Sequence, residues 1–192
     1  MSLPELPYEI WNKRIKNEIE ILKKLNITDG KSIKWYKDSV EIWLNLKALG
    51  FIRKYRSNNL NVAPKTEHRV FIKINRSFPY PGGIDFSWHS EIFHPNIHPV
   101  ELHNSNYLGT GYICLNILRK WSKLSDLETT AKSLQILVEN PNPEDPLQYN
   151  TCIDAAAFFK KNSVEELRKI FKVKRFYQLK VKKDNNIVVY KE

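Results

Sequence analysis

Apolar residues at helical spacing follow the first few positions of the chain. Between Tyr8 and Leu25 they recur at steps of four, four and three, which places them on one face of a helix. These positions are Trp11, Ile15, Ile19 and Leu22. Basic side chains lie largely off that face, at Lys13, Arg14, Lys16 and Lys23. The pattern predicts an amphipathic helix with a basic outer surface.

Three later runs alternate apolar and polar residues with period two, which is typical of strands with one buried face. Their apolar positions are Val40, Ile42, Leu44 and Leu46, then Val70, Ile72 and Ile74, then Ile84, Phe86 and Trp88. The third run follows a "YPGG" turn at residues 80–83. With a fourth strand around Lys34 to Lys37, we expect an antiparallel meander of four strands.

The second half of the chain returns to helical spacing. The apolar residues that carry it are Leu127, Ala131, Leu134, Leu137 and Val138, after which three prolines in "NPNPEDP" stop the helix. A second helix is expected over residues 151–160, and Ser163 with Glu166 forms a capping-box-like start to a third. Two final strand-like runs flank Asp184, Asn185 and Asn186, which favour a hairpin turn. The order of elements is that of an α+β fold.

Charge and length then limit the function classes. A chain of 192 residues fits one domain, or one domain with a small appendage. Its net charge of +10 raises an acidic partner, nucleic acid or an anionic membrane as binding partners. The Lys and Arg residues are spread along the chain without a nucleic-acid reader motif, and no apolar run is long enough for a membrane span. We therefore expect neither nucleic acid nor membrane as a partner.

The two cysteines, Cys114 and Cys152, do not form a disulfide framework, which favours a reducing, cytoplasmic setting. Cys114 lies in "GYICLNIL", where an inert buried thiol is the ordinary interpretation. The polar loop before it, with Gly109 and Gly111, can instead place an exposed cysteine close to a bound chain, and both interpretations stay open at this point. Cys152, in "NTCIDAAAFF" at a helix start, is interpreted as a packing residue.

Four histidines crowd into fifteen residues before Cys114, at His89, His94, His98 and His103. This cluster raises a zinc site and a Cys-His catalytic pair as two candidates. The spacing does not put ligands on one helical face, since Pro95 and Pro99 break any helix there, and no third group orients a histidine base. The sequence thus favours no metal.

Three motifs in order carry a resemblance to a known family. They are "HPN" at residues 94–96, "GYICLNILRKWS" at 111–122 and "NPNPEDPLQYNTCIDAAAFFKKN" at 140–162. Together they resemble the ubiquitin-conjugating enzymes, and the likeness covers most of residues 8–172. It implies a ubiquitin-conjugating domain over residues 1–172, followed by a C-terminal hairpin extension at 173–192.

The resemblance implies a transferase. Cys114 would accept ubiquitin or a ubiquitin-like protein as a thioester from an activating enzyme and pass it to a substrate lysine or a ligase, without a cofactor. Asn96 would donate to the oxyanion of the intermediate, or hold the loop that does so. Asp145 matches the acidic residue that orients the incoming lysine, and Leu147 would be an apolar wall beside it.

The resemblance also assigns binding surfaces. Lys13, Arg14 and Lys16 look like the helix face that docks on the activating enzyme. Tyr80, with Lys123 and Leu124, falls where many members bind RING-type ligases. The surrounding "YPGG" and "SKL" depart from the usual sequences.

Two further departures bear on the site. Asn116 replaces an aspartate that is frequent two positions after the cysteine. The stretch between Asn96 and Cys114 is more than twice the usual length, and "HPVELHNSNYLGT" at 98–110 supplies the excess. A non-catalytic module that binds a ubiquitin-like protein or a ligase is the alternative function, because a fold does not fix an activity.

Overall fold

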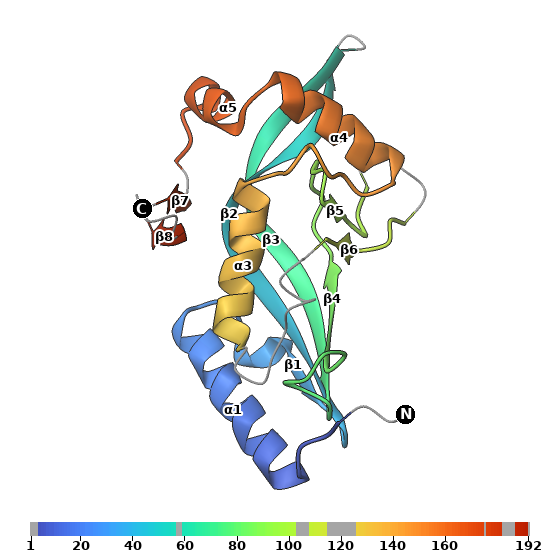
Figure 1. Cartoon of the computed structure of the whole chain (residues 1–192), viewed down its shortest axis with the longest axis vertical. Coiled ribbons are helices and arrows are strands. Elements are labelled where there is room, and N and C mark those ends of the chain that lie inside the picture. The colour runs from blue at the N-terminus through green and yellow to red at the C-terminus, as the bar shows by residue number, and fades with distance from the viewer. Residues whose placement is uncertain are drawn as a thin grey trace.

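A computed structural model of the chain describes residues 4–56, 59–102, 108–114, 126–174, 176–181 and 187–191. The helices are α1 (Tyr8–Lys24), the short 3-10 helix η1 (Gly30–Ser32), α3 (Leu127–Glu139), α4 (Asn150–Lys161) and α5 (Val164–Phe171). The strands are β1 (Ile33–Trp35), β2 (Ser39–Arg56), β3 (Asn59–Asn75), β4 (Ile84–Trp88), β5 (Ile97–His98), β6 (Tyr112–Ile113), β7 (Tyr177–Val181) and β8 (Ile187–Lys191). In Figure 1, α1 and α3 lie along one side of a long sheet, and α4 and α5 lie across its upper end.

The sheet confirms the predicted meander. Its strands run in the order β1-β2-β3-β4, and every neighbouring pair is antiparallel. Val40, Ile74 and Ile84 face one another across β2, β3 and β4, so the alternating apolar residues share one buried face. The stripe on α1 is buried as its spacing predicts, at Trp11, Ile15, Ile19 and Leu22. The α+β class expected from the sequence is therefore confirmed.

The second and third strands are longer than their sequence pattern indicates. Strand β2 continues ten residues past Leu46, and a β-bulge between Lys47 and Gly50 shifts its register on β3. Helix α3 binds the backbone that this bulge releases. Gln135 Nε2 donates to the carbonyl of Lys47 at 2.9 Å, and Glu139 Oε1 accepts from the amide of Leu49 at 2.9 Å. The bulge thus has its own partners, as buried backbone groups require.

Beyond the bulge, the β2–β3 hairpin packs into a second hydrophobic core. The main core lies between the sheet, α1 and α3, and contains Trp11 and Trp88. The second joins the far end of the hairpin to the two C-terminal helices through Leu49, Phe51, Val62, Phe93, Ala155, Phe159 and Leu167. Both cores therefore share the same two strands, which run the length of the molecule in Figure 1.

The C-terminal elements that the structure describes also agree with those predicted from the sequence. Ser163 and Glu166 form the expected capping box at the start of α5. Strands β7 and β8 pair antiparallel as a hairpin, while the predicted turn residues Asp184, Asn185 and Asn186 lie outside the described part of the chain. The amide of Phe176 donates to Glu139 Oε1 at 2.9 Å and anchors the segment that leads into β7. Of the helices that the structure describes, none is long and apolar enough to cross a membrane.

Candidate active site

Asn96 and Cys114 are neighbours in space although 18 positions separate them. The amide of Cys114 donates to the carbonyl of Asn96 at 2.9 Å. Strand β5 pairs with β6 directly beside this bond, with Ile97 opposite Ile113 and His98 opposite Tyr112. The pairing of β5 with β6 therefore keeps the two residues together.

Backbone hydrogen bonds join residues 98–100 to residues 109–112, and we call these two segments the neck. Trp88 at the end of β4 accepts from the amide of Val100 at 2.8 Å and donates to the carbonyl of Gly111 at 2.9 Å. The amide of Gly109 then donates to the carbonyl of Val100 at 2.8 Å. The stretch 98–110 that the sequence predicts as an insertion therefore begins and ends inside the fold, since His98 belongs to β5 and Gly109 is bonded to Val100.

Two glycines allow close backbone approach at the neck, one between its two segments and one against β4. A Cβ at Gly109 would lie 1.7 Å from the carbonyl oxygen of Pro99. Gly111 has a φ of +71°, and a Cβ there would lie 2.1 Å from the hydroxyl of Ser87. The glycines that sequence reasoning linked to a bound chain therefore have a structural role in closing this neck.

The side chain of Asn96 is 4% exposed, and all its described hydrogen bonds go to one loop. Its Nδ2 donates to the carbonyls of Asn142 at 3.1 Å and Asp145 at 2.8 Å, while its Oδ1 accepts from the amide of Asn142 at 2.8 Å. The amide of Leu147 donates to the carbonyl of Pro95 at 2.9 Å. We call residues 142–147 the gate loop. Of the two roles implied for Asn96, its contacts are those of holding this loop.

The ring of His94 holds the backbone of Asn96 in place. Its Nδ1 accepts from the amide of Asn96 at 3.0 Å, so its Nε2 carries the proton and donates to the carbonyl of Leu137 at 3.0 Å. Burial lowers the pKa of His94 to about 3, and the ring is therefore neutral at pH 7. Both ring nitrogens are engaged in the fold. Across the described ranges, no three side chains of His, Cys, Asp or Glu gather as a metal site.

The two cysteines lie in different surroundings. Cys114 is half-buried at the end of β6, whereas Cys152 is 1% exposed inside α4. Cys152 Sγ donates to the carbonyl of Ile97 at 3.4 Å, and burial raises the pKa of its thiol to about 11. Both thiols are free. Cys152 is thus a packing residue, as its sequence context predicts.

Asp145, the predicted acidic residue of the site, has an exposed carboxylate and lies in the gate loop that Asn96 holds.

A comparison with protein families identifies the chain. The model of the family described as "Ubiquitin-conjugating enzyme" matches residues 64–173, which is more than half of the sequence. The chain belongs to the ubiquitin-conjugating enzyme family.

Individual relatives within this family are distant. "Ubiquitin-conjugating enzyme E2 13" of Schizosaccharomyces pombe is 30% identical over 55% of this chain and 76% of its own length. "Ubiquitin-conjugating enzyme E2 N" of Drosophila melanogaster is 32% identical over 47% of this chain, and the chain spans only 62% of that relative. The solved E2 domain of a Toxoplasma gondii ubiquitin-conjugating enzyme has a TM-score of 0.50 at 21% identity, covering 84% of this chain and 94% of that one. The structural likeness supports the fold of this ubiquitin-conjugating enzyme family member.

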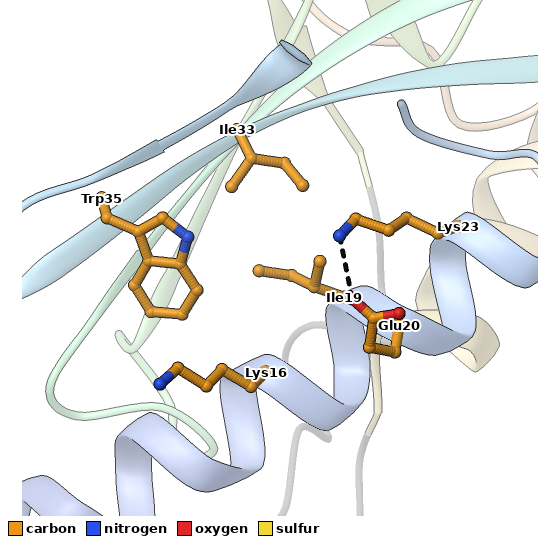
Figure 2. Close-up of a pocket in the computed structure, with 6 residues that line it drawn as sticks. All are labelled: Lys16, Ile19, Glu20, Lys23, Ile33 and Trp35. Carbon is orange, nitrogen blue, oxygen red and sulfur yellow. Dashed lines mark hydrogen bonds and ion pairs between the residues drawn. The ribbon is translucent and has the colours of Figure 1, made fainter. Parts of the chain in front are cut away.

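The basic face of α1 is divided between surface and packing. Lys13 and Lys16 are exposed, but Arg14 is half-buried, with its Nε 3.5 Å from Glu18 Oε1 and its guanidinium over the ring of Phe78. Figure 2 shows Lys16 at the rim of a groove of about 250 Å³ between α1 and β1. Its other lining residues are Ile19, Glu20, Lys23, Ile33 and Trp35.

The sequence did not single out Trp35 as part of this groove, where it is 43% exposed beside Lys16. The available signal was a large aromatic residue on a short strand at the edge of the sheet.

The expected ligase surface is described only in part. Tyr80 is half-buried in the turn between β3 and β4, where its amide donates to the carbonyl of Ser77 at 2.7 Å. This turn lies against the start of α1, because Arg76 Nη2 donates to the carbonyl of Leu6 at 2.7 Å. Residues Asn116, Lys123 and Leu124 lie outside the described part of the chain. A surface shared by Tyr80, Lys123 and Leu124 therefore stays a prediction.

Proposed function

We propose that this chain is a catalytically competent ubiquitin-conjugating enzyme with Cys114 as its nucleophile. The Cys114 thiolate attacks the carbonyl carbon of the thioester between an activating enzyme and ubiquitin or a ubiquitin-like protein. A new S–C bond forms on Cys114, and the thiol of the activating enzyme leaves. A lysine amine, or the thiol of a ligase, then displaces Cys114 in the same manner. No cofactor takes part in either displacement.

One observation carries this proposal: a half-buried free cysteine is hydrogen-bonded to the Asn96 backbone, and the Asn96 side chain holds the gate loop. The nucleophile and the loop expected to receive the lysine are thus built on one residue. A rigid gate loop would hold the exposed carboxylate of Asp145 where it can accept from the lysine ammonium. Leu147 supplies an apolar, half-buried neighbour in the same loop.

The partners follow from the same function. Lys13 and Lys16 would meet acidic groups of the activating enzyme, and complementary charge would speed that encounter. Tyr80 would contribute to a RING-type ligase surface. A free catalytic thiol persists in a reducing compartment, and we therefore propose that the protein is cytoplasmic.

The test is a charging assay under non-reducing conditions. The native chain is incubated with a cognate activating enzyme, ATP and ubiquitin, and in parallel reactions with ubiquitin-like proteins and their own activating enzymes. We expect an adduct that thiol reductant removes, with native yield in the Cys152→Ser variant. If no activating enzyme and modifier pair charges the folded native chain, the chain is a binding module and the enzyme proposal fails.

Asn96→Ala is expected to slow discharge of the thioester to free lysine on the order of 100-fold. The change removes three hydrogen bonds to the gate loop, each worth about 1 kcal/mol, and about 1.4 kcal/mol corresponds to a factor of ten in rate. Single-turnover discharge of preformed thioester measures the effect. Asn162→Ala is the matched control, because the side chain of Asn162 also donates to a backbone carbonyl, that of Phe158 in α4, but lies outside the gate loop. Native discharge by Asn96→Ala would show that the gate loop holds without it.

A further inference from the structure

The ring of His98 lies at the junction between the neck and the start of α4. His98 is 8% exposed, and its ring is stacked on Tyr149 with centroids 4.0 Å apart and planes 9° from parallel. At the edge of the ring, Nδ1 accepts from the amide of Thr110 at 3.2 Å and lies 2.8 Å from the Thr110 hydroxyl. One side chain thus contacts the neck and the segment that follows the gate loop.

The hydrogen bonds at Thr110 determine the form of the His98 ring. Since Nδ1 accepts from an amide, it is unprotonated, and the Thr110 hydroxyl therefore donates to it. That hydroxyl oxygen also accepts from the amide of Tyr112 at 3.2 Å. The neck, from Thr110 to the start of β6, is therefore ordered around a neutral His98.

Tyr149 passes this contact to the gate loop. Its amide donates to the carbonyl of Leu147 at 2.8 Å, and its own carbonyl accepts from the amides of Cys152 and Ile153, both at 2.9 Å. The residue thus joins the end of the gate loop to the first turn of α4. Any displacement of the Tyr149 ring would be transmitted to Leu147 through this short backbone segment.

We propose that His98 is a positioning residue that couples the neck to the gate loop, and thereby sets the rate of the aminolysis step. The catalytic part of this inference rests on the proposed function. Stacking on its face holds Tyr149, and the Thr110 bonds at its edge fix the ring.

The test separates the two contacts of the ring. His98→Phe keeps a flat ring for Tyr149 and loses the Thr110 acceptor, whereas His98→Ala loses both. In single-turnover discharge we expect the limiting rate of His98→Ala at saturating lysine to fall about tenfold, because small misplacements in a catalytic site cost up to about 100-fold. His98→Phe should recover at least half of that loss. Charging by the activating enzyme should stay within twofold of native in both variants.

A second readout does not depend on activity. Amide hydrogen exchange in His98→Ala should rise at least tenfold at both Leu147 and Tyr112, which report the gate loop and the neck. The matched control is His89→Ala, whose ring packs on Trp43 at 4.7 Å. Exchange that rises at only one of the two amides, or native discharge by His98→Ala, overturns the coupling. If the native chain does not charge at all, the proposed function fails while the exchange result still decides the contact.

Discussion

With Cys114 changed to lysine, the ubiquitin adduct is expected to survive thiol reductant. The amine of the new side chain would attack the activating enzyme's thioester, and an isopeptide bond would form in place of a thioester. Amides resist thiols, so the adduct should persist on reducing gels. Because Cys114 is half-buried at the end of β6, the longer side chain has access to solvent. The yield should build more slowly than for the native thiol, which is the better nucleophile.

The companion variant Cys114→Ala should form no adduct at either pH 7 or pH 8.5, since no nucleophile replaces the thiol. Gels with and without reductant, run for the native, Lys and Ala chains in parallel, measure the outcome. A reductant-sensitive adduct on Cys114→Ala would assign the thioester to another residue. An inert Cys114→Lys chain with an active native chain would indicate that the site admits only the shorter side chain.

Glu139→Leu is expected to lower the free energy of unfolding by roughly 4 kcal/mol. Glu139 is fully buried, and one of its oxygens accepts from the amides of Leu49 and Phe176. A polar group left without its hydrogen-bond partner costs about 1 to 3 kcal/mol, and the leucine would leave both amides without this acceptor. Urea unfolding measures the change. Glu139→Gln keeps an acceptor oxygen and should lose about half as much.

The matched control lies on the same helix. Glu128 is on the outer face of α3 and pairs with Lys132 at 2.6 Å, so Glu128→Leu should change the stability by about 0.5 kcal/mol or less. The Phe176 bond gives a second readout, because its loss should raise amide exchange along β7 in Glu139→Leu. A stability within 1 kcal/mol of native would show that the bulge does not need its carboxylate.

Local sequence predicted those elements whose burial follows a regular period. The stripe on α1, the alternating residues of β2 to β4 and the capping box at Ser163 each express their environment within a few positions. The extension of β2 has no such signal. The residues 48–51, "ALGF", break the alternation at the bulge, and the side chain that completes the bulge, Glu139, comes 90 positions later.

The candidate site divides in the same way. Sequence motifs singled out Asn96, Cys114 and Asp145, and the structure joins them through two hydrogen bonds. The partners of Asn96 could not be predicted, because they are backbone atoms whose positions depend on the fold. The stack of His98 on Tyr149 joins two residues that belong to no common motif, 51 positions apart.

The strands that the two hydrophobic cores share link the unfolding of one core to that of the other. Strands β2 and β3 run from the main core into the second one, and neither core has a sheet of its own. Melting of the hairpin at either end removes ladder bonds that continue into the other, so the two halves are expected to lose structure in a single cooperative transition. The helices beside the gate loop thereby draw on the stability of α1, at the opposite end of the molecule in Figure 1.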